Sequence, residues 1–170
     1  AVGDAVTGAA WENPPGGLYG STNPNSFTRV FAFPTSSPEE RKALMDFLND
    51  VVPTKSYLWL FSVQADGAAD FQPEAWAADS LTYGENLVQR LEGQGAQLVR
   101  NLINTGAVPY NLVYRKDEGR IGEDVASSPE EVIQTEVFIP INATEGSLET
   151  VRIGPAASWQ SLQWDRSNVD

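Results

Sequence analysis

Apolar residues recur with a helical period between Ser37 and Pro53. Four of them have the spacing i, i+3, i+4, i+7 and fall on one face of a helix: Leu44, Phe47, Leu48 and Val51. The sequence Ser37-Pro38-Glu39-Glu40 has the Ser, Pro and Glu positions of a capping box, and Pro53 ends the pattern. The segment therefore predicts an amphipathic helix. Four charged residues lie off the apolar stripe and are expected in solvent: Arg41, Lys42, Asp46 and Asp50.

Five other stretches predict strands from their β-branched and aromatic residues or their alternation: residues 28–33, 56–63, 108–115, 133–139 and 146–153. Residues 56–63 are apolar on both faces, which is typical of a central strand covered on both sides. We expect Trp59 in the core there. Along residues 133–139 the apolar side chains point one way, whereas Gln134 and Glu136 point the other way.

The remaining segments set the domain organisation. Residues 84–103 predict a helix, a glycine break and then a short helix or an irregular turn, and residues 64–82 are interpreted as a long loop. We expect an irregular N-terminal segment over residues 1–26, one domain over 27–153 and a linker to a following module over 154–170. The order of elements predicts an α+β fold, a mixed β-sheet sandwich with two or three packed helices.

Composition limits the chemistry that is open to this chain. Its 170 residues include 23 Asp and Glu against 11 Lys and Arg, a formal net charge of −12, and neither Cys nor His. These counts exclude Cys-His and Ser-His-Asp catalysis, thiolate or imidazole zinc sites, haem and iron–sulfur ligation, and disulfides. Carboxylate chemistry, oxygen-ligated cations, a Ser/Lys pair and binding without catalysis remain.

The negative charge also bears on partners. It disfavours nucleic acid and anionic membrane surfaces, both of which attract basic proteins. No run of about 18 apolar residues predicts a membrane span, and the N-terminal residues do not resemble a signal peptide. The simplest interpretation of the charge is a solubilising surface; the alternative is an acidic loop that binds a cation or a sugar.

The predicted loop at residues 64–82 is the candidate binding site because it combines aromatic and acidic residues. Trp76 and Tyr83 would stack on the apolar faces of a sugar ring. Three further side chains would hydrogen-bond its hydroxyl groups: Asp66, Asp79 and Arg100. We call these five residues the predicted glycan platform. The alternative interpretation is that Trp76 covers the core beside the helix.

Four carboxylates of this loop leave two further hypotheses open: Asp66, Asp70, Glu74 and Asp79. A calcium site would lack the spacing of an EF-hand. A glycosidase would need one carboxyl with a raised pKa, and the sequence selects no pair. A solvated acidic loop is the simplest interpretation. We therefore expect no cofactor, with calcium as the open exception.

The run VFAFPTSSPEERKALMDFLNDVVPTKSYLWLFSV, from residue 30 to 63, resembles the interleukin-like EMT inducer (PANDER-like) domain. Phe33-Pro34-Thr35 stands at the position of that family's F-D-T turn, and Phe47-Leu48 matches its helix pair. Residues 91–99 are similar to the family's second turn, and residues 109–116 to the strand that follows it. The resemblance covers roughly residues 28–120. It implies a β-β-α fold that acts by recognition, as in extracellular signalling or sugar binding.

Three stretches are also similar to large secreted proteins of Bacteroidota: residues 73–81, 95–102 and 153–164. Those proteins are gingipain-like sortase relatives associated with type IX secretion, in which the peptidase lies elsewhere. This similarity implies a non-peptidase module of a larger secreted or cell-surface bacterial protein. The leading hypothesis is thus a non-catalytic, lectin-like recognition module that binds a glycan or polysaccharide and contacts neighbouring domains. A structural spacer beside a peptidase and a carboxylate enzyme acting on polysaccharide are the alternatives.

Overall fold

The computed structural model describes residues 1–7, 9–12, 29–62 and 71–139. In this part of the chain, four strands form an antiparallel sheet in the order β1-β2-β3-β4. The strands are β1 (Val2–Gly3), β2 (Tyr57–Phe61), β3 (Tyr110–Arg115) and β4 (Gly119–Val125). The α+β class is confirmed. The described strands make one sheet with antiparallel pairs.

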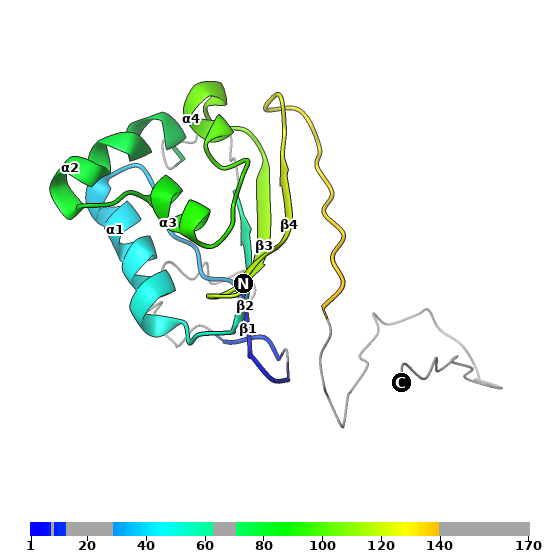
Figure 1. Ribbon diagram of the computed structural model, residues 1–170. Helices are drawn as coiled ribbons and strands as arrows, with labels where there is room; N and C mark the ends of the chain where they lie inside the picture. Colours follow the sequence, from blue (N-terminus) through cyan, green and yellow to red (C-terminus); the bar gives the residue numbers. More distant parts are fainter. Residues whose placement is uncertain (8, 13–28, 63–70, 140–170) are drawn as a thin grey trace, which may run out of the picture.

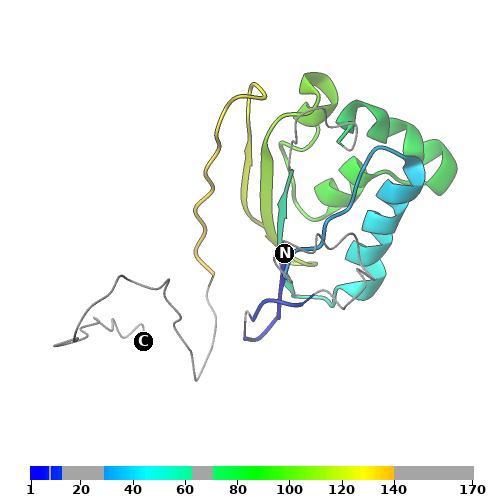
Figure 2. The same cartoon turned by 180° about the vertical axis from the view of Figure 1, so that it is seen from behind.

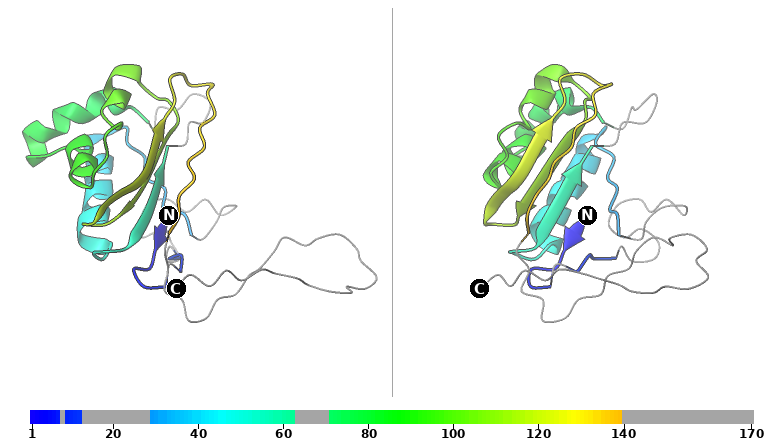
Figure 3. Two further views of the ribbon diagram at one scale, coloured as in Figure 1. Left: turned by 45° about the vertical axis from the view of Figure 1, so that its right-hand side comes forward. Right: turned by 90° about the vertical axis from the view of Figure 1, so that its right-hand side faces the viewer.

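Helices cover one face of this sheet (Figures 1 and 2). The described residues include four α-helices: α1 (Pro38–Asp46), α2 (Ser80–Tyr83), α3 (Leu87–Gly93) and α4 (Asn101–Thr105). A π-helical turn, η1 (Phe47–Val51), continues α1, and a 3-10 helix, η2 (Pro73–Asp79), precedes α2. An extended segment that ends at residue 139 lies on the opposite side of the sheet (Figure 3). The molecule is therefore layered as helices, sheet and extended segment.

The helix α1 begins as predicted, and η1 continues it to Val51, two residues before Pro53. The Ser37 hydroxyl accepts a hydrogen bond from the Glu40 N–H, and the Glu40 carboxylate accepts one from the Ser37 N–H. This reciprocal capping box satisfies backbone donors that a helix start otherwise leaves unpaired. The apolar stripe faces the sheet, with Phe47 and Leu48 buried. Arg41, in contrast, is buried as well, so the prediction that it lies in solvent is wrong.

The core lies between the helices and the sheet. It is built from side chains of α1, η1, η2, α3, α4 and the inner face of the strands, including Met45, Leu58, Trp76, Leu87, Val99, Leu102 and Leu112. The predicted helix, glycine break and short helix over residues 84–103 are confirmed as α3 and α4. Asn86 caps α3 in a second capping box, with Gln89 at the third position. The predicted strand at 108–115 is confirmed as β3.

The opposite face of the sheet carries the extended segment. Between residues 131 and 139, half-buried Ile133, Thr135, Val137 and Ile139 alternate with exposed residues, as the period of two predicts. The contact point on the sheet is Gly122 of β4: a Cβ there would lie 2.6 Å from Val137 Cγ1 and 3.0 Å from Thr135 Cγ2. The segment forms no ladder with the described strands, so the predicted strand 133–139 is extended but unpaired there.

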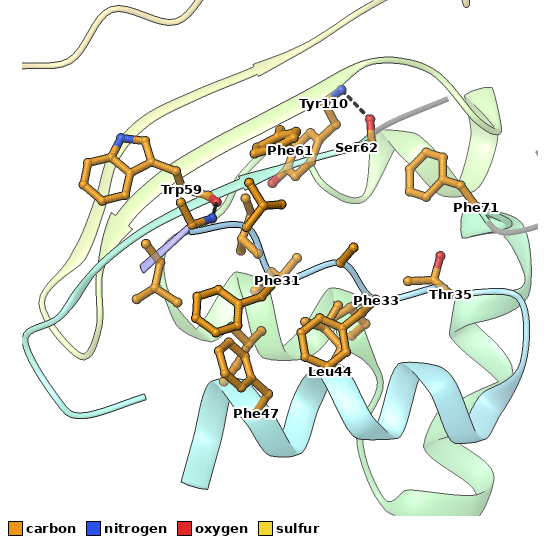
Figure 4. Close-up of a pocket in the computed structure, with 18 of the residues that line it drawn as sticks. Phe31, Phe33, Thr35, Leu44, Phe47, Trp59, Phe61, Ser62, Phe71 and Tyr110 are labelled. Atoms are coloured by element: carbon orange, nitrogen blue, oxygen red, sulfur yellow. Dashed lines mark hydrogen bonds between the residues drawn. The ribbon is translucent and has the colours of Figure 1, made fainter. Parts of the chain in front are cut away.

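Several predicted elements need correction. Residues 29–33 are not part of the four-stranded sheet, and residues 73–82 of the predicted loop are helical, within η2 and α2. The N-terminal segment, expected to be irregular, contributes β1. Trp59 is only half-buried and its ring points away from the core face of β2 (Figure 4). The predicted strand 146–153 and the linker 154–170 lie outside the described residues.

Candidate functional site

The predicted glycan platform is not assembled on the surface. Trp76, which was to be its stacking ring, lies on η2 with only 3% of the residue exposed. Phe71 meets it edge-on, with ring centroids 5.6 Å apart. The interpretation that Trp76 covers the core is therefore confirmed, and the expectation of an exposed stacking face is wrong. The reason is that residues 73–79 form a helical turn whose apolar side packs inward.

Asp79 is the second residue of the predicted glycan platform that is buried in the structure. Its carboxylate accepts two hydrogen bonds from the Arg41 guanidinium, from Nε at 2.5 Å and from Nη2 at 2.7 Å. The side chains are 2% and 1% exposed. Arg41 Nη1 also donates to the carbonyl oxygens of Thr35 and Ser36. The hydrogen bonds that Arg41 donates to Asp79 raise the pKa of Arg41 above its usual value. This buried pair joins α1 to η2 and is not available to a sugar.

The other platform residues are dispersed. Tyr83 is half-buried at the end of α2, with Lys42 Nζ 6.0 Å from its ring centroid. Arg100, just before α4, is exposed and forms a two-point ion pair with Glu92 at 2.7 and 2.6 Å. Asp66 lies outside the described residues. Of the four predicted residues that the structure describes, only Trp76 and Asp79 share one element, and both are buried there.

A concave feature of about 460 Å³, lined mainly by aromatic and aliphatic residues, lies between α1, the segment 30–35 and β2 (Figure 4). Phe31 and Phe33 of that segment point toward Phe47 of η1, with ring centroids 5.0 and 5.2 Å apart. The other wall is formed by Leu60 and Phe61 of β2 and by Ser62, the residue that follows β2. Phe71 lies at one end of the pocket. We call this feature the aromatic pocket.

The local sequence explains why the walls stand apart. The segment 30–35 precedes the Ser37 cap, and Pro34 lacks the N–H that a strand ladder would use. The segment is not part of the four-stranded sheet, and the rings of Phe31 and Phe33 pack against Phe47 of η1. The strand predicted over residues 28–33 would place these rings in a sheet. The only local signal against that interpretation is Pro34.

The polar groups of the pocket wall are mostly paired within the protein. Ser62 Oγ donates to the Val108 carbonyl and accepts a hydrogen bond from the Tyr110 N–H. The Tyr110 hydroxyl donates to Glu123 at 2.8 Å. The Ala1 amino group donates to the Trp59 carbonyl, and desolvation by burial lowers its pKa to about 6. No charged side chain is found among the described residues that line the pocket.

The described residues also bear on metal binding and on membrane spans. In residues 1–139, outside the gaps already given, no cluster of three or more acidic side chains is placed to hold a metal ion. Asp66 and Asp70 lie in one of those gaps, so the calcium hypothesis stays a prediction. No helix in the described part is long and apolar enough to cross a membrane. No protein-family model matches the chain, and no match was found among curated proteins or solved structures.

Proposed function

We propose that this domain is a non-catalytic recognition module of a larger secreted or cell-surface bacterial protein, and that it binds an apolar ligand in the aromatic pocket. The observation that carries the ligand site is a cavity of about 460 Å³ with a wall of aromatic and aliphatic residues. Pockets of roughly 300–1,000 Å³ with mainly apolar walls are typical of ligand sites. The bacterial surface setting rests on the similarity of residues 73–81, 95–102 and 153–164 to large secreted proteins of Bacteroidota.

An apolar ligand suits this pocket better than a sugar. A sugar presents many hydroxyl groups, and each of them loses water on entering a cavity unless the wall supplies a partner. The hydroxyl groups of Ser62 and Tyr110 already donate hydrogen bonds to acceptors within the protein. Phe31, Phe33 and Phe47 contribute only apolar ring surface to the pocket. Burial of apolar ligand surface against these rings stabilises the complex by about 25 cal/mol per Å².

The test uses N-phenyl-1-naphthylamine, a neutral probe that fluoresces strongly only in apolar sites. We expect saturable binding at one site per chain. Leu44 lines the pocket and is half-buried, so Leu44→Trp should fill it and weaken probe binding at least tenfold. Leu81→Ser is the matched control, because Leu81 is 93% exposed and lies outside the pocket wall. It should leave probe binding unchanged.

Two results would contradict this function. Absence of saturable probe binding to the folded wild type would favour the spacer hypothesis. Equal binding to Leu44→Trp and the wild type would place the probe elsewhere. A glycan array run on the same protein separates the ligand classes: glycan binding without probe binding would restore the carbohydrate hypothesis and remove the apolar one. Circular dichroism in the far and near ultraviolet confirms that each variant is folded.

A further inference from the structure

One residue of the aromatic pocket carries a hydrogen-bond donor that the protein leaves unused. Three buried side-chain atoms have no hydrogen-bond partner in the part of the chain that the structure describes: Trp76 Nε1, Arg90 Nε and Thr135 Oγ1. Of these three residues, only Trp76 lines the aromatic pocket. A buried tryptophan usually pairs its indole N–H, because a buried donor without an acceptor is destabilising. An unpaired N–H on a pocket residue therefore indicates that a ligand supplies the acceptor.

The element that carries this donor is held in a fixed position. Trp76 lies on η2, and the buried ion pair between Arg41 and Asp79 joins η2 to α1. The indole ring is thus positioned in the pocket before any ligand arrives. A donor that is already positioned loses little conformational freedom on binding, which favours affinity.

The other polar groups of the wall restrict the chemistry of the acceptor. The hydroxyl groups of Ser62 and Tyr110 already donate to acceptors within the protein. The described residues that line the pocket include no charged side chain, and the chain has a net charge of −12. A carboxylate would lose its water there and gain a neutral donor, which does not offset the burial of a charge. A neutral carbonyl oxygen is satisfied by one donor and therefore fits.

Access to the indole N–H requires a side chain to move, because Nε1 is itself buried. Phe71 is placed for this movement. It lines the pocket, is half-buried and meets the Trp76 ring edge-on, with ring centroids 5.6 Å apart. Side chains at binding sites commonly change rotamer when a partner binds. Rotation of the Phe71 ring would let an acceptor approach the edge of the indole.

We propose that the aromatic pocket selects neutral apolar molecules that carry a carbonyl group, such as a ketone or an ester, and that the carbonyl oxygen accepts a hydrogen bond from Trp76 Nε1 once the Phe71 ring moves aside. This inference rests on the proposed function and names its ligand class. Ligand sites commonly combine an apolar wall with a few placed polar groups that fix orientation. Here the rings supply affinity, and the indole N–H supplies the preference for a carbonyl over a hydrocarbon of the same shape.

Two probes of one shape isolate this hydrogen bond. The ketone 2-acetylnaphthalene carries a carbonyl oxygen where the alkene 2-isopropenylnaphthalene carries a methylene group. Displacement of N-phenyl-1-naphthylamine measures the affinity of each. Comparing the ketone-to-alkene affinity ratio of the wild type with that of Trp76→Phe cancels the difference in hydration between the probes. We expect the ratio to fall at least about threefold in Trp76→Phe, as loss of one neutral hydrogen bond predicts.

Phe31→Leu is the matched control, because Phe31 lines the same pocket, is half-buried and has no hydrogen-bonding group in its side chain. It should weaken the binding of both probes alike and leave their affinity ratio unchanged. The anion 2-naphthoate tests the restriction to neutral ligands. It should bind at least about tenfold more weakly than the ketone, because its charge would be buried without an ionic partner.

Heteronuclear NMR on the wild type observes the donor directly and needs no variant to fold. The indole N–H signal of Trp76, assigned by through-bond experiments, should shift downfield with the ketone and not with the alkene. Exchange of the same N–H with deuterium tests the part played by Phe71. In Phe71→Ala this exchange should be at least about tenfold faster than in the wild type, because the ring that covers the N–H is gone.

The outcomes separate this inference from the function beneath it. An equal affinity ratio in the wild type and Trp76→Phe, or an unmoved Trp76 N–H signal in the ketone complex, would overturn the hydrogen bond. Binding of the naphthylamine without displacement by the ketone would also overturn it, while leaving the apolar pocket as a ligand site. Binding of 2-naphthoate as tight as that of the ketone would overturn the restriction to neutral ligands, and unchanged exchange in Phe71→Ala would overturn the movement of Phe71. Failure of the naphthylamine, the ketone and the alkene to bind would overturn the proposed function itself.

Discussion

Arg41 and Asp79 show how a single pair of residues can hold two helices together. Fully buried charges are rare unless they are paired, because removal from water costs several kcal/mol per ion. Here each carboxylate oxygen of Asp79 accepts one guanidinium hydrogen bond, and two backbone carbonyls take the remaining donors on Nη1. The pair is thus satisfied internally, and its geometry fixes the position of η2 against α1.

Breaking this pair on one side should destabilise the protein strongly. Asp79→Asn or Arg41→Met leaves one buried group without its ionic partner, and each should lower the free energy of unfolding by about 3–5 kcal/mol. The double variant Arg41→Met with Asp79→Leu should recover most of that loss. Urea unfolding measures all three. Lys42→Met is the control at the exposed Lys42–Asp46 pair and should cost less than about 1 kcal/mol. Additive losses in the double variant would contradict the coupling.

Substitutions of Trp76 test how the packing of η2 contributes to stability. Trp76→Ala empties a core position and should lower the free energy of unfolding by about 3–5 kcal/mol. Trp76→Phe keeps an aromatic ring and removes an indole N–H that has no hydrogen-bond partner in the part of the chain described. Its cost should therefore be clearly smaller. Thermal unfolding followed by circular dichroism compares the two. A folded Trp76→Ala protein with unchanged stability would contradict the burial of Trp76 in the core.

Two tyrosines of β3 give the fold a characteristic response to alkali. Burial, more than any other cause, raises the pKa of both Tyr110 and Tyr114 above the usual value of about 10. In the unfolded chain they ionise near pH 10, whereas in the folded protein they stay protonated. The folded state is therefore favoured fully below that pH and loses stability as the pH rises above it.

An absorbance titration at 295 nm checks this behaviour. The chain has five tyrosines. We expect Tyr110 and Tyr114 to ionise only together with the loss of the circular dichroism signal. In Tyr110→Phe, the step that accompanies unfolding should shrink by one tyrosine. Reversible ionisation of all five tyrosines in folded protein would contradict the burial of this pair.

At the scale of elements, the extended segment over residues 131–139 depends on one glycine. Gly122→Ala places a methyl group within 2.6 Å of Val137 Cγ1, closer than two carbon atoms can approach. The segment should move off the sheet while β3 and β4 stay paired. Thermolysin cleavage within residues 131–139 should then become faster, with little change in cooperative unfolding. Gly93→Ala is the control, because a Cβ there meets no atom within 4 Å. Unchanged cleavage in Gly122→Ala would show that the segment does not rest on β4.

Local signals predict some elements of this fold and not others. The helix α1 follows from its capping box and its apolar stripe, and both signals lie within the element itself. The strand β4 escapes prediction because Gly119–Val125 carries Arg120, Gly122 and Glu123, which are polar or small. Glu123 is nevertheless buried in the hairpin, since its carboxylate accepts hydrogen bonds from the N–H groups of residues 97, 98 and 99. That partner loop is more than 20 residues away, so a local pattern cannot report it.

The same distinction applies to the site at the scale of the whole molecule. Composition limits the chemistry before any fold is known, because the chain lacks Cys and His. The aromatic pocket, however, forms where the segment 30–35, α1 and β2 diverge, and only the tertiary arrangement brings Phe31 near Leu60. From the sequence alone, Trp76 is predicted to lie on the surface as part of the glycan platform. Its burial follows from the contacts of η2 with α3 and α4, which are equally non-local.

Net charge is the property of the whole molecule that sequence alone establishes, and its energetic effect is open to measurement. Like charges repel one another more in the compact state than in an expanded chain, so a net charge of −12 destabilises the fold at low ionic strength. Salt screens exposed charges, with a Debye length of about 30 Å at 0.01 M and 10 Å at 0.1 M. Raising sodium chloride from 10 to about 500 mM should therefore increase stability by about 1 kcal/mol, or roughly 2–4 °C in the melting temperature.

A charge-reduced variant separates screening of this repulsion from other effects of salt. Asp50, Glu74 and Glu130 are exposed and form no ion pair with any described residue. Replacing them with Asn, Gln and Gln lowers the net charge to −9, since −12 plus three removed negative charges gives −9. The variant should melt at a higher temperature than the wild type in 10 mM salt and gain less from added salt. An equal salt response in both proteins would mean that preferential exclusion of salt, and not charge repulsion, governs the stability of this acidic domain.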